Sequence, residues 1–114
     1  MTRPARGESD AVRPADDERL RDRWRELVGE RLPAAAREPG RRWPVRFDHC
    51  FARILLDDAC DRPWREAVRA PAWRNAPAEV LERAIATGEA VLAGEADLGA
   101  LNRRSLTLRG KTVR

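Results

Sequence analysis

The sequence is poor in the residues that build disulfide frameworks and metal centres. Its 114 residues include two cysteines, one histidine, two phenylalanines and no tyrosine. Two cysteines are too few for a disulfide framework, and Cys50 and Cys60 would lie about 15 Å apart on one continuous helix. A structural zinc site needs four ligands, normally in closely spaced pairs. We therefore predict no metal site and no cofactor.

Long apolar runs are also missing. No run approaches the roughly 18–20 apolar residues that cross a bilayer, and residues 1–17 lack the apolar stretch of a secretory signal. The length suits one domain with a modest core. These features predict a cytoplasmic protein with reduced thiols and no membrane partner.

Positive charge comes almost entirely from arginine and is unevenly distributed. Of 23 basic residues only Lys111 is a lysine, and the formal net charge is +4. Residues 41–75 carry eight arginines against five acids, and residues 102–114 carry five bases and no acid. The intervening residues 76–101 carry one arginine and five acids. Basic regions of this kind can bind phosphates or an acidic partner.

Apolar residues recur at helical spacing in the first half of the chain. They predict a helix over residues 17–32, capped by Asp16 or Asp17 and ended by Pro33. Asp48 is predicted to be the N-cap of a second helix, HCFARILLDDA.

The second half of the chain contains three further helical patterns. Asp61 is predicted to cap a piece of about two turns that ends at Pro71. The clearest helix starts near Pro77 and stops at Gly94. Gly88 lies in its middle, where glycine costs about 1 kcal/mol relative to alanine, so we expect a close helix crossing there.

The last helical pattern covers residues 98–108. Together the patterns predict an all-α domain, a small bundle of four to five short helices over residues 17–109. A disordered leader is expected over residues 1–16, and a flexible basic tail over residues 110–114.

Residues 43–60 gather the histidine, both cysteines and both phenylalanines. Asp48, His49 and Cys50 are candidate catalytic residues, because a helix N-terminus lowers the pKa of a thiol and thiol nucleophiles work with an adjacent base. The side chains of three successive residues nevertheless point in different directions on a helix, and free cysteines are usually buried. The alternative is a helix at the centre of the core, with Phe47, Phe51, Ile54 and Leu55 as its apolar residues.

Two adjacent aspartates, Asp57 and Asp58, follow this apolar stripe. Adjacent carboxylates point in different directions on a helix, so capping and solvation explain them better than paired acid–base chemistry. Of the two, Asp58 falls on the predicted apolar stripe.

Three of the four tryptophans lie beside an arginine in the sequence. Trp43, Trp64 and Trp73 neighbour Arg42, Arg65 and Arg74. Interleaved aromatic and arginine residues are typical of surfaces that bind single-stranded nucleic acid or a nucleotide. Packing at the core and domain edge is the plainer interpretation.

The last helix carries a basic polar face. Asn102, Arg103 and Arg104 lie opposite its leucines, and the arginines could hold a phosphate or carboxylate bidentately. Alternatively, they form a solvated face near the helix C-terminus.

The segments RWPVRFDHCFARILLD and LNRRSL resemble a small family of uncharacterised bacterial proteins, some of them labelled acetyltransferase-related. The resemblance covers about residues 42–110 and implies no established activity. The common acetyltransferase fold needs a β-sheet and a glycine-containing loop for the coenzyme A pyrophosphate. The sequence has neither pattern, so the label is not supported. The resemblance points to RFDHCF and NRRS as the place of any site, with Arg46 and Arg103 clamping a small anionic ligand.

Three functions remain open from the sequence. The first is a non-enzymatic helical interaction module that binds a protein or anionic partner through its basic faces. The second is nucleic-acid binding, and the third is a small enzyme or ligand binder around Asp48, His49 and Cys50. A homodimer would also suit a small alanine-rich helical domain. The candidate ligand- or phosphate-binding residues are Arg46, Asn102, Arg103 and Arg104.

Overall fold

The structure is a computed structural model that describes residues 17–111. The predicted leader over residues 1–16 and the last three residues of the predicted tail lie outside the described part. The first helix begins at Asp17, whose Oδ1 accepts hydrogen bonds from the backbone N–H groups of Arg19 at 2.9 Å and Leu20 at 3.4 Å. This side chain satisfies two N–H groups that have no partner inside the helix. The predicted N-cap Asp17 is therefore confirmed.

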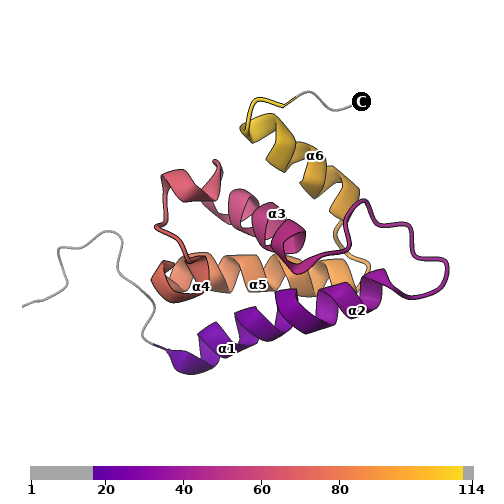
Figure 1. Cartoon of the computed structure of the whole chain (residues 1–114), viewed down its shortest axis with the longest axis horizontal. Coiled ribbons are helices and arrows are strands. Elements are labelled where there is room, and N and C mark those ends of the chain that lie inside the picture. Colours follow the sequence, from indigo (N-terminus) through magenta and orange to yellow (C-terminus); the bar gives the residue numbers. More distant parts are fainter. Residues whose placement is uncertain (1–16, 112–114) are drawn as a thin grey trace, which may run out of the picture.

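Three helical segments follow one another without a break and form a single rod (Figure 1). They are α1 (Glu18–Glu26), the π-helical turn η1 (Leu27–Arg31) and α2 (Leu32–Ala36). The predicted end at Pro33 is wrong, because helical backbone continues to Ala36. In η1 the N–H of Leu32 bonds to the carbonyl of Leu27, five residues back. This wider turn accommodates Pro33, whose ring would clash in a regular α-helix.

The central helix is α3 (Asp48–Cys60), and it is buried on several sides. Phe51, Ile54 and Leu55 are all buried, which confirms that this helix lies in the core. Phe47 precedes the helix in extended conformation and is 63% exposed, so its predicted place in the core is wrong. The predicted N-cap is also wrong by one residue: Phe47 is the cap and Asp48 is the first helical residue.

The chain after α3 is less helical than the sequence suggested. Asp61 does not cap the next helix; it ends α3 in the left-handed conformation, with φ of 60°. The predicted two-turn piece is a single 3-10 turn, η2 (Trp64–Glu66), and Pro71 precedes the short α4 (Ala72–Asn75). Pro71 pushes the residue before it out of the helical region, which limits the length of any helix between Pro63 and Pro71.

The second long helix is α5 (Ala78–Leu92), and Gly88 lies where it crosses its neighbours. A Cβ atom on Gly88 would lie 2.6 Å from Leu27 Cδ2 and 3.1 Å from Leu55 Cδ1. The predicted close crossing is therefore confirmed. The predicted stop at Gly94 is also confirmed, since this residue has a φ of 78° and follows the end of α5 by two residues.

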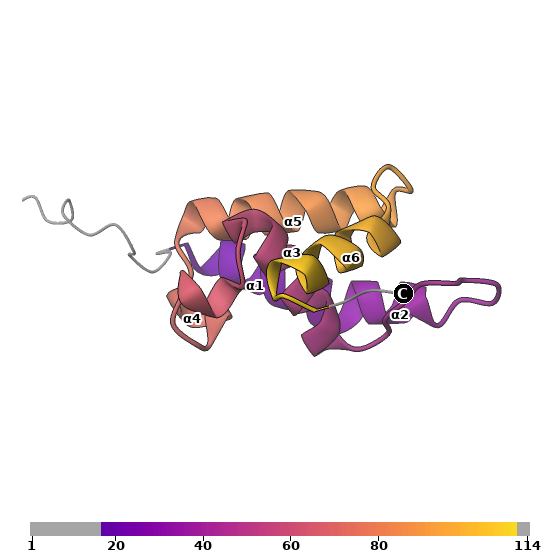
Figure 2. The ribbon, with the colours of Figure 1, turned by 90° about the horizontal axis from the view of Figure 1, so that it is seen from above.

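The last helix is α6 (Leu98–Leu108), capped by Asp97, which accepts a hydrogen bond from the N–H of Ala100 at 3.2 Å. In Figures 1 and 2 the rod and α5 run side by side, α3 packs on them, and α6 lies along a further side of α3. One buried apolar cluster joins these helices. Counted with the rod as one helix, the described part of the chain has five helices, together with the 3-10 turn η2, and no strand, which confirms the predicted all-α bundle.

Among residues 17–111, no helix combines the length and apolar character that a membrane crossing requires.

Candidate functional site

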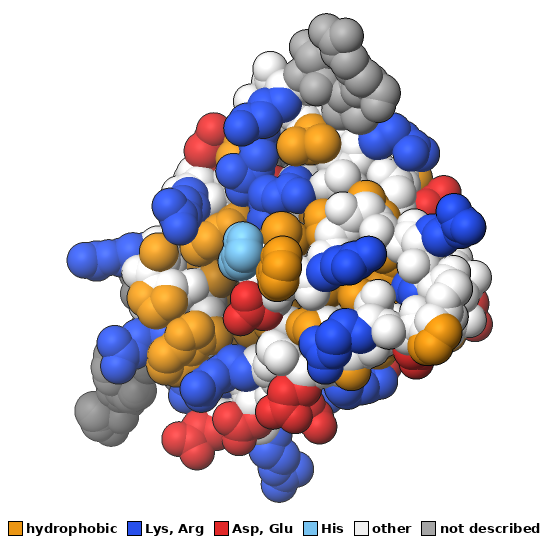
Figure 3. All heavy atoms as spheres, turned by 45° about the vertical axis from the view of Figure 1, so that its right-hand side comes forward, with side chains coloured by type: hydrophobic (Ala, Val, Ile, Leu, Met, Phe, Trp, Pro, Cys, Tyr) orange, Lys and Arg blue, Asp and Glu red, His pale blue; other side chains and the backbone are white. Residues whose placement is uncertain are grey.

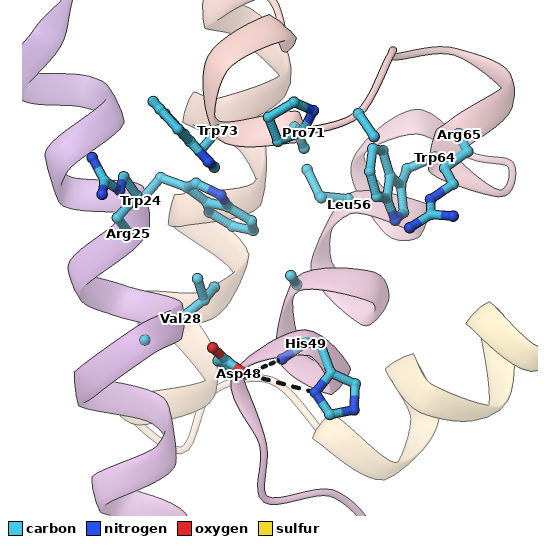
Figure 4. A pocket seen from close by; sticks show the side chains of 14 residues that line it. Trp24, Arg25, Val28, Asp48, His49, Leu56, Trp64, Arg65, Pro71 and Trp73 are labelled. Carbon is cyan, nitrogen blue, oxygen red and sulfur yellow. Dashed lines mark hydrogen bonds and ion pairs between the residues drawn. The ribbon is translucent and has the colours of Figure 1, made fainter.

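A hollow of about 450 Å³ lies between α1, the start of α3 and the segment from Trp64 to Trp73 (Figure 4). We call it the central hollow. Its floor is apolar: Trp24 and Leu56 are only 2% and 1% exposed, and both line it. Trp64, Pro71 and Trp73 stand around it as walls. A mainly apolar hollow of this volume is typical of small-molecule or peptide sites.

Arginine side chains stack on the tryptophans at the mouth of the central hollow. The guanidinium carbon of Arg25 lies 4.5 Å from the ring centre of Trp73, and that of Arg74 lies 5.7 Å from the same ring. Arg65 stacks in the same way on Trp64, at 5.2 Å. Such contacts hold the cation over the ring face and leave the N–H groups at the guanidinium edge free to face a carboxylate or phosphate.

Asp48 and His49 lie at the opposite end of the hollow from Trp73 and Pro71 (Figure 4). Asp48 Oδ1 accepts a hydrogen bond from the backbone N–H of His49 at 2.7 Å and lies 3.6 Å from His49 Nδ1. The His49 side chain is 78% exposed, and the Phe47 ring stacks on it with a centre-to-centre distance of 6.0 Å. Cys50 is half-buried and does not line the central hollow. The three candidate catalytic residues therefore do not converge on this hollow.

Two smaller hollows adjoin the central one. The proline hollow, about 380 Å³, shares Gly29 and Asp48 with it. The N-terminal hollow, about 330 Å³, shares Arg25 and Trp73 with it. The proline hollow is completed by Pro33, Arg37, Arg46 and Phe47, and the N-terminal hollow by Glu18, Arg21, Asp22 and Arg74.

The three hollows form one groove along a single face of the rod. The rod residues that line it recur at three- and four-residue steps, which place them on the same side of a helix. They are Glu18, Arg21, Asp22, Trp24, Arg25, Val28, Gly29 and Pro33, followed by Arg37 just after the end of α2. Figure 3 shows hydrophobic side chains gathered around the pale blue histidine, with Lys and Arg side chains spaced around them.

The structure separates the four residues predicted to bind a ligand or phosphate. Arg46 lines the proline hollow, whereas Arg103 is exposed on α6. In Figure 1, α6 packs along another side of α3 from the rod, and Arg103 lines none of the three hollows, so the clamp between Arg46 and Arg103 stays a prediction.

The other two predicted residues have partners within the protein. Asn102 Oδ1 accepts a hydrogen bond from Arg53 Nη2 at 2.8 Å. Arg104 Nε pairs with Asp58 at 3.1 Å, and its Nη2 contacts Asp61. These carboxylates raise the pKa of Arg104: the hydrogen bond that Arg104 donates to Asp61 is the larger cause, and the one it donates to Asp58 is the next. Asn102 and Arg104 thus fasten α6 to α3.

Sequence reasoning missed the most buried polar group, Asp57, which is 0% exposed. Its carboxylate accepts hydrogen bonds from Ser105 Oγ at 2.6 Å and from the backbone N–H of Trp64 at 2.8 Å. Arg109 binds both carboxylate oxygens, through Nε at 2.7 Å and Nη2 at 3.0 Å. The hydrogen bonds that Arg109 donates to Asp57 raise the pKa of Arg109.

This network explains why the wrong aspartate was placed near the core. The predicted stripe includes Asp58, but both aspartates contact α6 and Asp57 is the one that is fully buried, whereas the Asp58 side chain is 25% exposed. Ser105 also accepts a hydrogen bond from Arg53 Nη1 at 2.8 Å, so Arg53 and Asp57 meet at one serine. A serine among leucines on the buried side of the last helix was the signal that a polar partner lay opposite.

The cysteines are both unpaired and half-buried. Burial raises the pKa of the Cys60 thiol, and the Asp57 carboxylate adds to that effect. Within residues 17–111, no three His, Cys, Asp or Glu side chains are placed to hold a metal ion together.

Comparisons with family models, with curated proteins and with solved structures gave no match to this chain. The resemblance to small bacterial proteins stays a prediction.

Proposed function

We propose that this protein is a non-enzymatic helical interaction module that binds an acidic segment of a partner protein in the groove. The observation that carries the proposal is the stacking of Arg25 on Trp73 and of Arg65 on Trp64 at the mouth of an apolar hollow. Tryptophan and arginine are the residues that most often dominate the binding energy of protein interfaces. A stacked guanidinium combines apolar contact area with charge in one place.

The charge of the groove supports an anionic partner. The three hollows are lined by six arginines and three carboxylates, so the groove carries a formal charge of +3. The ion pairs among the described residues use other arginines, namely Arg31, Arg41, Arg104 and Arg109. The arginines of the groove are therefore suited to meet charges on a partner. The six are Arg21, Arg25, Arg37, Arg46, Arg65 and Arg74.

Titration with a fluorescein-labelled oligoglutamate peptide, followed by anisotropy at low salt, tests the proposal. We expect binding that the Arg25→Ala/Arg65→Ala double variant weakens and that physiological salt reduces. The Arg62→Ala/Arg103→Ala double variant is the matched control, because it removes two exposed arginines that line none of the three hollows. Equal weakening by the control would show attraction to net charge and would overturn the groove as the site. Absence of binding at low salt would overturn the proposal itself.

Single-stranded nucleic acid is the second candidate ligand, and one observation favours it. Trp64 and Trp73, each with a stacked arginine, line the same hollow, and bases could stack on such rings. The third tryptophan of the predicted surface, Trp43, lies elsewhere, edge-on to Phe51. Anisotropy with a labelled oligonucleotide distinguishes the candidates, since binding to nucleic acid should fall steeply as salt rises.

We also propose that the protein works in the bacterial cytoplasm. Its cysteines are free, as expected where thiols are kept reduced. An enzyme built on Asp48, His49 and Cys50 is the less favoured alternative, since Cys50 lies outside the hollow that the other two line.

A further inference from the structure

We propose that the partner segment is an acidic amphipathic α-helix that lies along the groove, parallel or antiparallel to the rod. This inference rests on the proposed function and names the class of partner. The apolar stripe of the helix would rest on the floor of the central hollow, and its acidic residues would meet the arginines of the walls.

The length and shape of the groove fit a helix. From Arg21 in the N-terminal hollow to Arg37 in the proline hollow the rod advances sixteen residues, or about 24 Å at about 1.5 Å per residue. A partner helix of about sixteen residues would cover that distance. The part of the chain that the structure describes has no strand, so it offers no sheet edge to an extended peptide. Helical walls favour a helix, which can pack its ridges between theirs.

The exposed large apolar side chains also lie on the groove. Among the described residues these are Phe47, at 63% exposure, and Trp73, at 36%. Phe47 lines the proline hollow and Trp73 lines the N-terminal and central hollows, so they stand near opposite ends of the groove. Apolar groups exposed at both ends of an apolar floor are typical of an interaction surface. They would contact apolar residues on one face of the partner helix.

The distribution of charge favours an acidic helix over nucleic acid. Glu18, Asp22 and Asp48 lie in the groove among the arginines. Each would oppose a continuous line of phosphates, whereas an amphipathic helix can place its acidic residues opposite the arginines alone. The apolar floor of Trp24, Val28 and Leu56 would also remain uncovered by a phosphate backbone.

Gly29 allows the groove to be blocked without removing a native contact. It lines both the central and the proline hollow, and a Cβ atom built on it meets no atom within 4 Å. A Gly29→Met variant would project a side chain into this open space. Gly29→Ala adds one methyl group at the same position and is the matched control.

The experiment is a selection from a display library of random peptides about sixteen residues long, with the purified full chain as bait. Peptides that also bind the Trp73→Ala/Phe47→Ala double variant are removed. We expect the retained sequences to be acidic, with apolar residues at i, i+3, i+4 and i+7. The best peptide should bind the Gly29→Met variant at least about tenfold more weakly than the wild-type protein. The loss for Gly29→Ala should be smaller, because one methyl group fills little of the groove. Arg103→Ala, which lies outside the groove, should bind as the wild-type protein does. Circular dichroism and urea unfolding verify that each variant is folded.

Each other outcome overturns the inference in a recognisable way. Acidic sequences without helical periodicity would overturn the helix and leave the proposed function standing. Neutral or basic sequences, or none that distinguish the double variant, would overturn both. Displacement of the selected peptide by a single-stranded oligonucleotide at physiological salt would assign the groove to nucleic acid. Sedimentation showing a homodimer that Gly29→Met dissociates and Arg103→Ala does not would assign the groove to a second copy.

Discussion

Ser105 donates its hydroxyl hydrogen to Asp57 across 2.6 Å, although the two residues lie 48 positions apart in the sequence. The contact joins α6 to the last turn of α3, and Arg109 binds the same carboxylate one turn later in the chain. A buried carboxylate is tolerated only when hydrogen bonds and an opposite charge replace its water. The position of α6 is therefore set by polar partners as well as by apolar packing.

Asp57→Ala should strongly destabilise the protein. The substitution leaves Arg109, Ser105 and the N–H of Trp64 without their shared acceptor, and breaking a buried ion pair costs about 3–5 kcal/mol. Urea unfolding at neutral pH measures this loss. Asp58→Ala is the control, since its exposed partner Arg104 limits the effect to about 0–1 kcal/mol. Equal losses in the two variants would contradict the central role of Asp57.

Gly88→Ala should lower stability, although alanine is the better helix former. The new methyl group would lie 2.6 Å from Leu27 Cδ2, and Leu27 is fully buried. Overpacking of this kind costs about 1–3 kcal/mol, more than the gain of about 1 kcal/mol in helix propensity. Gly29→Ala, with no atom near the new methyl group, should instead keep or raise stability. Thermal unfolding of the two variants measures the contrast, and a stabilised Gly88→Ala would refute the close crossing.

Cys60 should react slowly with iodoacetamide in the folded protein. Burial, and then the charge of Asp57, raise the pKa of the thiol above its ordinary 9.0, so less thiolate is present at a given pH. A Cys50→Ser variant leaves Cys60 as the thiol to be followed, and mass spectrometry measures its alkylation rate. This rate should still rise with pH above pH 9.0. At a given pH it should also increase when the protein is unfolded in urea. A rate that levels off below pH 9.0 would argue against this environment.

The pair between Arg31 and Glu89 should contribute a small, acid-sensitive stabilisation. Arg31 binds both carboxylate oxygens of Glu89, at 2.7 and 2.8 Å, and these hydrogen bonds lower the pKa of Glu89 below its ordinary 4.5. A lowered pKa in the folded state stabilises the protein above the unfolded-state pKa, and the effect is lost as pH falls through the folded-state value. Both side chains are about 40% exposed, so solvent screening limits the contribution to about 0.2–1 kcal/mol.

Comparison of Glu89→Gln with wild type by urea unfolding at neutral and strongly acidic pH tests this pair. The difference in unfolding free energy should be present at neutral pH and shrink in acid. Glu82→Gln, at an exposed position of the same helix, is the control and should show little change at either pH. A difference between Glu89→Gln and wild type that grows in acid would have the wrong sign for this pair.

Local signals in the sequence determined most of the helices. Asp17 and Gly94 are recognised because a cap and a stop depend on a few neighbouring residues. Gly88 allowed a tertiary contact to be predicted from the sequence, because a close helix crossing explains a glycine in the middle of a helix. The predicted helix end at Pro33 was wrong because the π-helical turn before it cannot be recognised from helix propensities.

The groove was decided by tertiary structure. The sequence paired each tryptophan with its neighbour in the chain, and the contacts of Arg65 with Trp64 and of Arg74 with Trp73 are local in that sense. The closer contact on Trp73 comes from Arg25, on a helix far earlier in the chain. No local sequence pattern predicts the contact between Arg25 and Trp73, because it depends on how α4 packs against α1.

What can be predicted from the sequence therefore depends on how far apart the interacting residues lie in the chain. Helix periodicity, caps and stops act over three to five residues, so the sequence by itself determined an all-α chain with α3 at its centre. Which of Asp57 and Asp58 is buried, and which tryptophans share a hollow, depend on the directions in which packed helices place their side chains. Those directions are set by contacts between residues distant in sequence, and only the tertiary structure decides them.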